Sequence, residues 1–419
     1  MVFFYWLIAI MPLDQHPFWG REFFGTFTII KALGVVCFLI ALARIATRGV
    51  YPDFLKTAQA RWYLLLLCWQ CSSYFVHWGQ LALGAMAYSH VISIATLFIA
   101  AVTLVDSRKR LRWTLLVAIG SAGFASLYTV RQQQKYGYLI GFRPGGLLGD
   151  ANEYALVVGL WMPIAFIWAL SNRPIRERLF CFGSLGLMAL GVTFAASRGG
   201  FIGVILGFLF LIWNSRNRVR NLVLVAALAV PLALFSGSSV LQRFTNPAYG
   251  DKLAEQARVI TWKAGLRMIA AHPLVGVGLH NFKPTVTRYE NGEGIESLAH
   301  NTYIEVTAEL GIPGGILFVG TLLAPFWTLE RNRRRALAAG RTHPANVALG
   351  LEAGLLSFAV SAFFVSGWWE KMLWLMIFLT TRLHLVLGRR SRIPRRRNGG
   401  ASLADARVQQ ASVAPYRES

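Results

Sequence analysis

Three basic side chains of this sequence have the properties needed for chemistry on a diphosphate: Arg198, Arg258 and His300. Arginine presents paired N–H donors and stays charged, so two arginines suit a phosphate or pyrophosphate. A neutral histidine suits removal of a proton from a hydroxyl group. Together these groups fit a transfer in which a sugar anomeric carbon leaves a pyrophosphate and joins an alcohol, while the arginines stabilise charge on the leaving phosphate.

Each of the three residues also has an ordinary explanation. Arg258 follows Glu255 by three residues, the spacing of a salt bridge on a helix surface. His300 has the alternative of a loop histidine that bonds to the backbone. Arg198 has the alternative of extending its charged end to the membrane surface from an apolar segment.

The segment around Arg258, residues 251–273, is predicted to be an amphipathic helix, with Pro273 just beyond its end. It is long enough for a membrane span but carries too many charges, so we expect it to lie along the membrane surface. Its apolar residues recur at three- and four-residue steps: Leu253, Ala257, Ile260, Ala264 and Met268.

His300 precedes a second predicted helix. Thr302 and Glu305 have the spacing of a capping box, so the helix is expected to begin near Thr302. Gly311 and Pro313 are expected to interrupt it before the next span. A histidine just ahead of a helix N-terminus is kept neutral by the helix dipole, as a general base requires.

The rest of the chain must hold these residues in a membrane. Of the 419 residues, 55% are hydrophobic and only 15% are charged. Apolar runs long enough to cross a bilayer recur along the chain. We predict an all-α polytopic membrane protein of about twelve transmembrane helices, near residues 2–12, 24–43, 62–77, 81–105, 113–130, 153–171, 179–196, 199–213, 221–237, 312–328, 345–366 and 370–388.

The net charge of +23 is concentrated in short loops between these runs. This pattern is typical of the positive-inside rule, and no continuous basic face for nucleic acid is visible. The rule places both termini in the cytoplasm and the long loop 238–311 on the outer side. Residues 1–388 then form the membrane domain, and the basic tail 389–419 is expected to be disordered.

Arg198 lies inside an apolar stretch, residues 179–213, that has basic residues on both flanks. Two short spans joined by a tight turn keep both basic flanks on the inner side. Arg198 is then at the outer end of this hairpin, where Gly199 and Gly200 are expected to permit the turn.

Several motifs resemble the O-antigen ligase and polymerase superfamily of bacterial inner membranes. They are "SRGG" at the start of a span, "ARVITWKAGLRMIAAHPLVGVGLHNF", "AHNTYIEVTAELGIPGG" and, between the fifth and sixth spans, "FRPGGLLGDANEYA". The resemblance covers roughly residues 140–320. It implies a membrane glycosyltransferase that moves a glycan from undecaprenyl pyrophosphate to an acceptor at the periplasmic face.

The resemblance also implies roles for individual residues. Arg198 and Arg258 match the arginines that hold the donor pyrophosphate, and His300 matches the histidine proposed to activate the acceptor hydroxyl, with inversion at the anomeric carbon. The further candidates for substrate contact are Arg143, Asn152, Arg267 and Asn301, of which Arg267 is also the alternative second arginine.

Alternatives remain within and outside this class. The acceptor is lipid A–core for a ligase, another lipid-linked repeat for an O-antigen or exopolysaccharide polymerase, or a protein hydroxyl for an oligosaccharyltransferase. The outer carboxylates show no obvious metal-binding spacing, so we expect metal-independent chemistry without a cofactor. A transporter or flippase also fits twelve spans, but it predicts ionisable groups at mid-membrane or an internal repeat.

Overall fold

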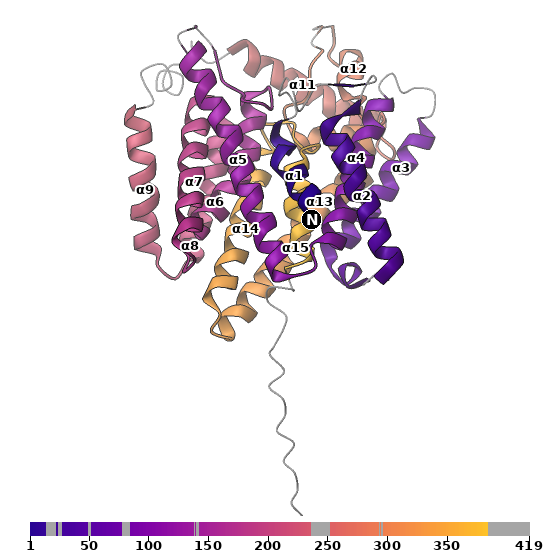
Figure 1. Ribbon diagram of the computed structural model, residues 1–419. Coiled ribbons are helices and arrows are strands. Elements are labelled where there is room, and N and C mark those ends of the chain that lie inside the picture. Colours follow the sequence, from indigo (N-terminus) through magenta and orange to yellow (C-terminus); the bar gives the residue numbers. More distant parts are fainter. Residues whose placement is uncertain are drawn as a thin grey trace, which may run out of the picture.

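The computed structural model describes residues 1–13, 22–23, 27–48, 52–77, 84–137, 139, 142–235, 252–292, 294 and 296–383, which form a helical bundle (Figure 1). Two short strands, β1 and β2, pair antiparallel with Glu22 opposite Thr28. The elements are α1 (Val2–Ile10), η1 (Met11–Leu13), β1 (Glu22–Phe23), β2 (Phe27–Thr28), α2 (Ile29–Arg48), η2 (Pro52–Lys56), α3 (Ala58–Val76), α4 (Gly84–Leu104), α5 (Arg108–Tyr136), α6 (Ala151–Ala169), α7 (Ile175–Ala195), α8 (Arg198–Asn214), α9 (Arg218–Phe235), α11 (Lys252–Ala271), α12 (Phe282–Val286), η3 (Thr287–Tyr289), α13 (Thr302–Ala338), α14 (Thr342–Ser361) and α15 (Lys371–Thr381).

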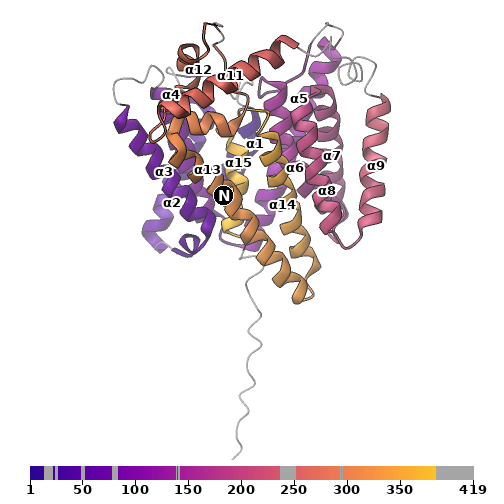
Figure 2. The same ribbon diagram turned by 180° about the vertical axis from the view of Figure 1, so that it is seen from behind.

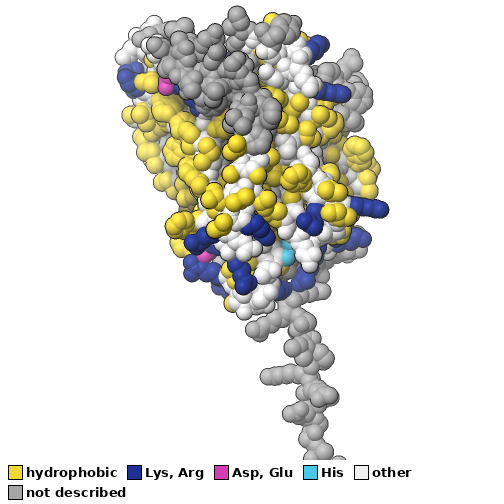
Figure 3. Space-filling model, turned by 90° about the vertical axis from the view of Figure 1, so that its left-hand side faces the viewer, with side chains coloured by type: hydrophobic (Ala, Val, Ile, Leu, Met, Phe, Trp, Pro, Cys, Tyr) yellow, Lys and Arg dark blue, Asp and Glu magenta, His cyan; other side chains and the backbone are white. Residues whose placement is uncertain are grey.

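The composition of these helices makes the chain a membrane protein. Each of the twelve apolar runs overlaps a helix, and six helices are long and apolar enough to cross a membrane. A space-filling view shows hydrophobic side chains over the flank of the bundle, with lysines and arginines gathered below them (Figure 3). The number of runs that cross the membrane remains a prediction. The six helices are Ile29–Thr47, Arg108–Tyr136, Ala151–Ala169, Ile175–Ala195, Thr302–Ala338 and Thr342–Ser361.

The bundle has two ends of different character. We call the end where α6, α8 and α13 begin the site end, and α11 and α12 lie across it (Figures 1 and 2). We call the opposite end the basic end, because arginines cluster in and beside its connections. The connections at the basic end include residues 105–107, 170–174, 215–217 and 339–341.

Two helices form the centre of the bundle. Every residue of α6 except Glu153 is buried, and α6 packs against α5, α7, α8 and α14. In α15 every residue from Met372 to Thr381 is buried. Because α6 is enclosed by neighbouring helices, its N-terminus provides a rigid support at the site end.

The turn between α7 and α8 forms differently from the prediction. Gly199 and Gly200 do not make it, because both already lie within α8. Ala196 makes the turn, with a left-handed φ of 46°. The two glycines allow close packing instead: a Cβ atom on Gly199 would be 2.5 Å from Phe364 Cβ, and one on Gly200 would be 2.5 Å from Ala155 Cβ.

Some sequence predictions fall elsewhere. Residues 238–250, part of the expected outer loop, and the tail 389–419 lie outside the described residues. The span predicted over 345–366 ends earlier, because α14 stops at Ser361 and residues 362–370 form a connection to α15. This connection contributes directly to the candidate site.

Candidate active site

Arg198 is the first residue of α8 and is exposed at the site end. The helix begins there because the preceding Ser197 is the N-cap, and its hydroxyl accepts a hydrogen bond from Gly200 N at 3.3 Å. The same hydroxyl donates to Asn152 Oδ1 at 2.9 Å. The N-terminus of α8 is therefore fixed to the start of α6.

Arg143 and Asn152 reinforce this junction from behind. The Arg143 guanidinium donates to Asn152 Oδ1 at 2.8 Å and to the Ala195 carbonyl at 3.1 Å. Asn152 is buried, and its amide oxygen accepts from both Arg143 and Ser197. The structure thus brings both predicted residues to the turn that carries Arg198, where Arg143 donates to Asn152 and Asn152 accepts from Ser197.

His300 lies two residues before α13 and is half-buried. Its φ of 47° is left-handed, a conformation that is rare for residues other than glycine and often found at functional sites. The helix begins at Thr302 as predicted, but the capping-box assignment is wrong. The cap is Asn301, whose Oδ1 accepts from Tyr303 N at 3.0 Å and Ile304 N at 3.1 Å.

Thr302 and Glu305 instead contact the connection 362–370. Thr302 N donates to the Ala362 carbonyl at 2.8 Å, and its hydroxyl donates to the Val365 carbonyl at 2.6 Å. Glu305 is buried and accepts a hydrogen bond from Ser366. These side chains are therefore used to hold the start of α13 against this connection.

The same connection also reaches α8. Phe364 packs against Gly199, and the nearby Ser361 hydroxyl donates to the Gly199 carbonyl at 3.3 Å. The connection therefore links α8, which begins with Arg198, to α13, which His300 precedes by two residues. The sequence prediction missed this role because residues up to 366 read as part of an apolar span.

Arg258 is half-buried and belongs to α11, the helix that lies across the site end (Figure 1). No carboxylate of the described ranges forms an ion pair with it, so the expected salt bridge to Glu255 is absent there. Trp262, one turn later, donates through Nε1 to the Ala299 carbonyl at 2.7 Å. This bond attaches α11 to the residue just before His300.

The pKa of His300 depends on its burial and on two neighbouring charges. Burial lowers its pKa below 6.5, the Arg258 charge lowers the pKa further, and the Asp150 charge opposes this effect. Arg258 and Asp150 are therefore close enough for their charges to act on the imidazole. The lowered pKa keeps His300 neutral at pH 7, the form that accepts a proton.

Arg267 does not join this group. Nine residues separate it from Arg258, about two and a half helical turns, so the two side chains leave α11 on opposite faces. Arg267 is exposed, and its Nη1 donates to the Tyr289 carbonyl at 2.7 Å. The structure therefore favours Arg258 over Arg267 as the second arginine.

Sequence reasoning missed a second histidine at this end. His280 has a left-handed φ of 59°, and its ring stacks on Trp369 with centroids 4.1 Å apart and an interplanar angle of 7°. Its Nε2 lies 3.1 Å from His90 Nδ1. Burial lowers the pKa of His280 to about 4. The sequence signal was the pair of glycines in "PLVGVGLHNF": the structure gives Gly276 and Gly278 positive φ values of 68° and 95°.

Comparison with known families bears on this arrangement. Residues 183–319 match the family model described as O-antigen ligase. This match, over about a third of the chain, supports the resemblance to the O-antigen ligase superfamily. The O-antigen ligase match includes Arg198, Arg258, Arg267, His300 and Asn301, whereas Arg143 and Asn152 precede it. A search of curated proteins finds no match to the chain.

Proposed function

We propose that this O-antigen ligase family protein is a glycosyltransferase that moves a glycan from undecaprenyl pyrophosphate to an acceptor hydroxyl, with lipid A–core as the acceptor. The proposal includes a periplasmic site end and cytoplasmic termini in a bacterial inner membrane. Residues 1–388 form the membrane domain, and 238–311 form its periplasmic loop.

The observation that carries the proposal is the charge arrangement around His300. Its imidazole is kept neutral by burial and by Arg258. The Thr302 hydroxyl donates to the Val365 carbonyl and the Ser361 hydroxyl donates to the Gly199 carbonyl, and these bonds join the start of α13 to the start of α8. The α8 and α13 N-termini both lie at the site end, and helix N-termini favour anions. A diphosphate next to a hydroxyl is the substrate pair that such a site suits.

In the proposed step, His300 removes the proton from the acceptor hydroxyl as its oxygen attacks the anomeric carbon. The bond from that carbon to the phosphate oxygen breaks, and its electron pair leaves with undecaprenyl pyrophosphate. Arg198 and Arg258 stabilise the negative charge that grows on this leaving group. Attack from the face opposite the diphosphate inverts the anomeric configuration.

Arg143 and Asn152 position Arg198 in this proposal, and Asn301 positions His300 by capping α13. The proposed step uses neither a metal ion nor an organic cofactor. Among the described residues no group of three His, Cys, Asp or Glu side chains is arranged to hold a metal ion. The proposed step is metal-independent, so transfer is expected to continue in the presence of a chelator.

The test is an assay of the purified protein with an undecaprenyl-pyrophosphate-linked oligosaccharide and lipid A–core. The wild type is expected to make a new glycosidic bond, and His300→Gln is expected to lose most of its turnover while still binding donor. His272→Gln is the matched control, because His272 is an exposed histidine at the end of α11 that contacts Tyr289.

Product analysis separates the alternatives. Glycan on lipid A–core supports the ligase, longer lipid-linked polymer indicates a polymerase, and glycan on protein indicates an oligosaccharyltransferase. Movement of the lipid-linked glycan across vesicles without a new bond would overturn the enzymatic proposal in favour of a flippase.

A further inference from the structure

A pocket lined by basic and apolar side chains lies at the basic end, far along α13 from His300. It is bounded by the η2–α3 junction, the later turns of α13 and the end of α15. Its lining includes Lys56, Arg331 and Arg335 together with Trp327 and Thr380. None of these residues takes part in the candidate active site.

The floor of this pocket is held by a buried hydrogen-bond chain. Gln59 is fully buried, and its Nε2 donates to Thr380 Oγ1 at 3.1 Å. Thr328 donates through its hydroxyl to Gln59 Oε1 at 2.9 Å. These bonds join α3, α13 and α15, so the walls of the pocket have a fixed spacing.

The charges of the pocket are all of one sign. Arg331 and Arg335 are spaced four residues apart on the same face of α13, and Lys56 lies across from them. No carboxylate is among the described residues that line the pocket.

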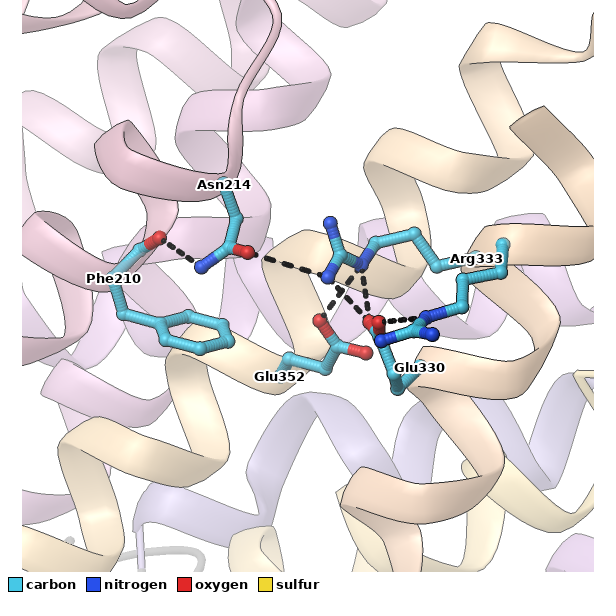
Figure 4. Close-up of polar contacts among 6 residues, drawn as sticks. Phe210, Asn214, Glu330, Arg333 and Glu352 are labelled. Atoms are coloured by element: carbon cyan, nitrogen blue, oxygen red, sulfur yellow. Dashed lines mark hydrogen bonds and ion pairs between the residues drawn. The ribbon is translucent and has the colours of Figure 1, made fainter.

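The nearest carboxylate on α13, Glu330, faces the other way. Figure 4 shows Arg333 between Glu330 and Glu352, on the side of α13 that faces α14 and α8. Arg333 also donates to Asn214 Oδ1 at 3.3 Å. The basic end of α13 therefore separates into an ion-paired face and a face that offers only positive charge.

The pocket also reaches the apolar surface of the bundle. Trp327 is 83% exposed and lies one turn before Arg331, on the side of α13 that continues into its apolar part. Tryptophan at this depth is typical of the membrane–water interface. A ligand here would meet positive charge at its head and an apolar surface beside it.

We propose that this pocket binds an anionic phospholipid that carries two phosphates, of the cardiolipin type. Three positive side chains, Lys56, Arg331 and Arg335, match its two phosphates. Basic pockets between membrane helices are suited to such headgroups. The bound lipid joins α3, α13 and α15 at the end opposite the candidate active site.

Native mass spectrometry of the full chain in detergent, titrated with cardiolipin, tests this site. Arg331→Gln with Arg335→Gln is expected to weaken cardiolipin binding by about thirtyfold, since each basic side chain near a lipid surface contributes about fivefold. Arg176→Gln with Arg216→Gln is the matched control. These two arginines are also exposed at the basic end but lie outside the pocket, so binding is expected to stay near wild type.

Three results would overturn the proposal: equal binding by the pocket variant and the wild type, equal binding of phosphatidylethanolamine, or displacement of cardiolipin by equimolar inorganic pyrophosphate. The last result would identify a soluble anion as the ligand. If the double variant does not fold, the single Arg331→Gln variant is measured, with a loss of about fivefold expected. None of these readouts depends on glycosyl transfer.

Discussion

The two ends of the bundle hold their polar groups in different ways. Among the described residues, five arginines at the basic end form ion pairs with carboxylates. At the site end, Arg143 and Arg267 donate to carbonyls and an amide oxygen. The ion pairs that the structure describes at the basic end are Arg44–Asp106, Arg110–Asp106, Arg112–Glu177, Arg333–Glu330, Arg333–Glu352 and Arg334–Glu330.

Backbone strain also differs between the two ends of the bundle. The described residues other than glycine that have positive φ are Ala196, His280, Asn291 and His300, and all four are at the site end. Strained residues persist where the surrounding structure holds them and where function uses their geometry. The basic end therefore contributes mainly stability, while the site end sacrifices some stability to place its side chains.

The largest expected effect is on activity at the site end. Arg258→Ala should lower transfer by about 10²–10³-fold, the usual effect of removing one donor to developing charge, with little change in melting temperature. Lys263→Ala is the control, because Lys263 is exposed on the same helix. Near-normal transfer by Arg258→Ala would break the comparison and remove this residue from the site.

The next effect is on stability at the basic end. Arg333→Ala leaves the buried Glu352 without its cation, 3.3 Å away, so the free energy of unfolding should fall by about 3 kcal/mol. Thermal unfolding in detergent measures this loss, while transfer per folded molecule should stay within about twofold of wild type. Adding Glu352→Leu should recover stability, because the unpaired charge is then gone. An unchanged melting temperature would contradict the structural role.

Much of this organisation follows from the sequence. The length of the apolar runs determines where helices occur, and the basic loops show which helix ends lie at the same end of the bundle. The helix around Arg258, the helix start at Thr302 and the interruption at Gly311, where φ is 71°, all agree with the prediction. Local patterns were sufficient at these positions because each depends on neighbouring residues alone.

The parts that the sequence could not predict depend on contacts between distant segments. Thr302 reads as a cap from spacing, yet its hydroxyl is bonded to Val365, and Asn301 takes the capping role. Gly199 was predicted to be a turn residue, yet it lies in α8, where a side chain would clash with Phe364. Each error has the same cause, because the connection 362–370 is invisible to local patterns.

A smaller effect tests the strain itself. Ala196→Gly removes the steric cost of a left-handed residue, so the free energy of unfolding should rise by about 1 kcal/mol. Ala195→Gly is the control: Ala195 ends the helical part of α7, and glycine there should be destabilising. If Ala196→Gly lowers the melting temperature as much as the control does, strain at the site end is not what distinguishes the two regions.

The smallest effect concerns the charge near His300. Asp150 caps α6 through Oδ1, and asparagine is an equally good cap, so Asp150→Asn should preserve the fold while removing one negative charge. Because that charge raises the pKa of His300, its loss should lower the pKa further and move the acid limb of the pH profile of kcat/KM to lower pH. Glu296→Gln, an exposed loop change of the same charge, should leave the limb in place. If the acid limb of the pH profile moves to higher pH in Asp150→Asn, the group that titrates is not a His300 whose pKa is raised by Asp150.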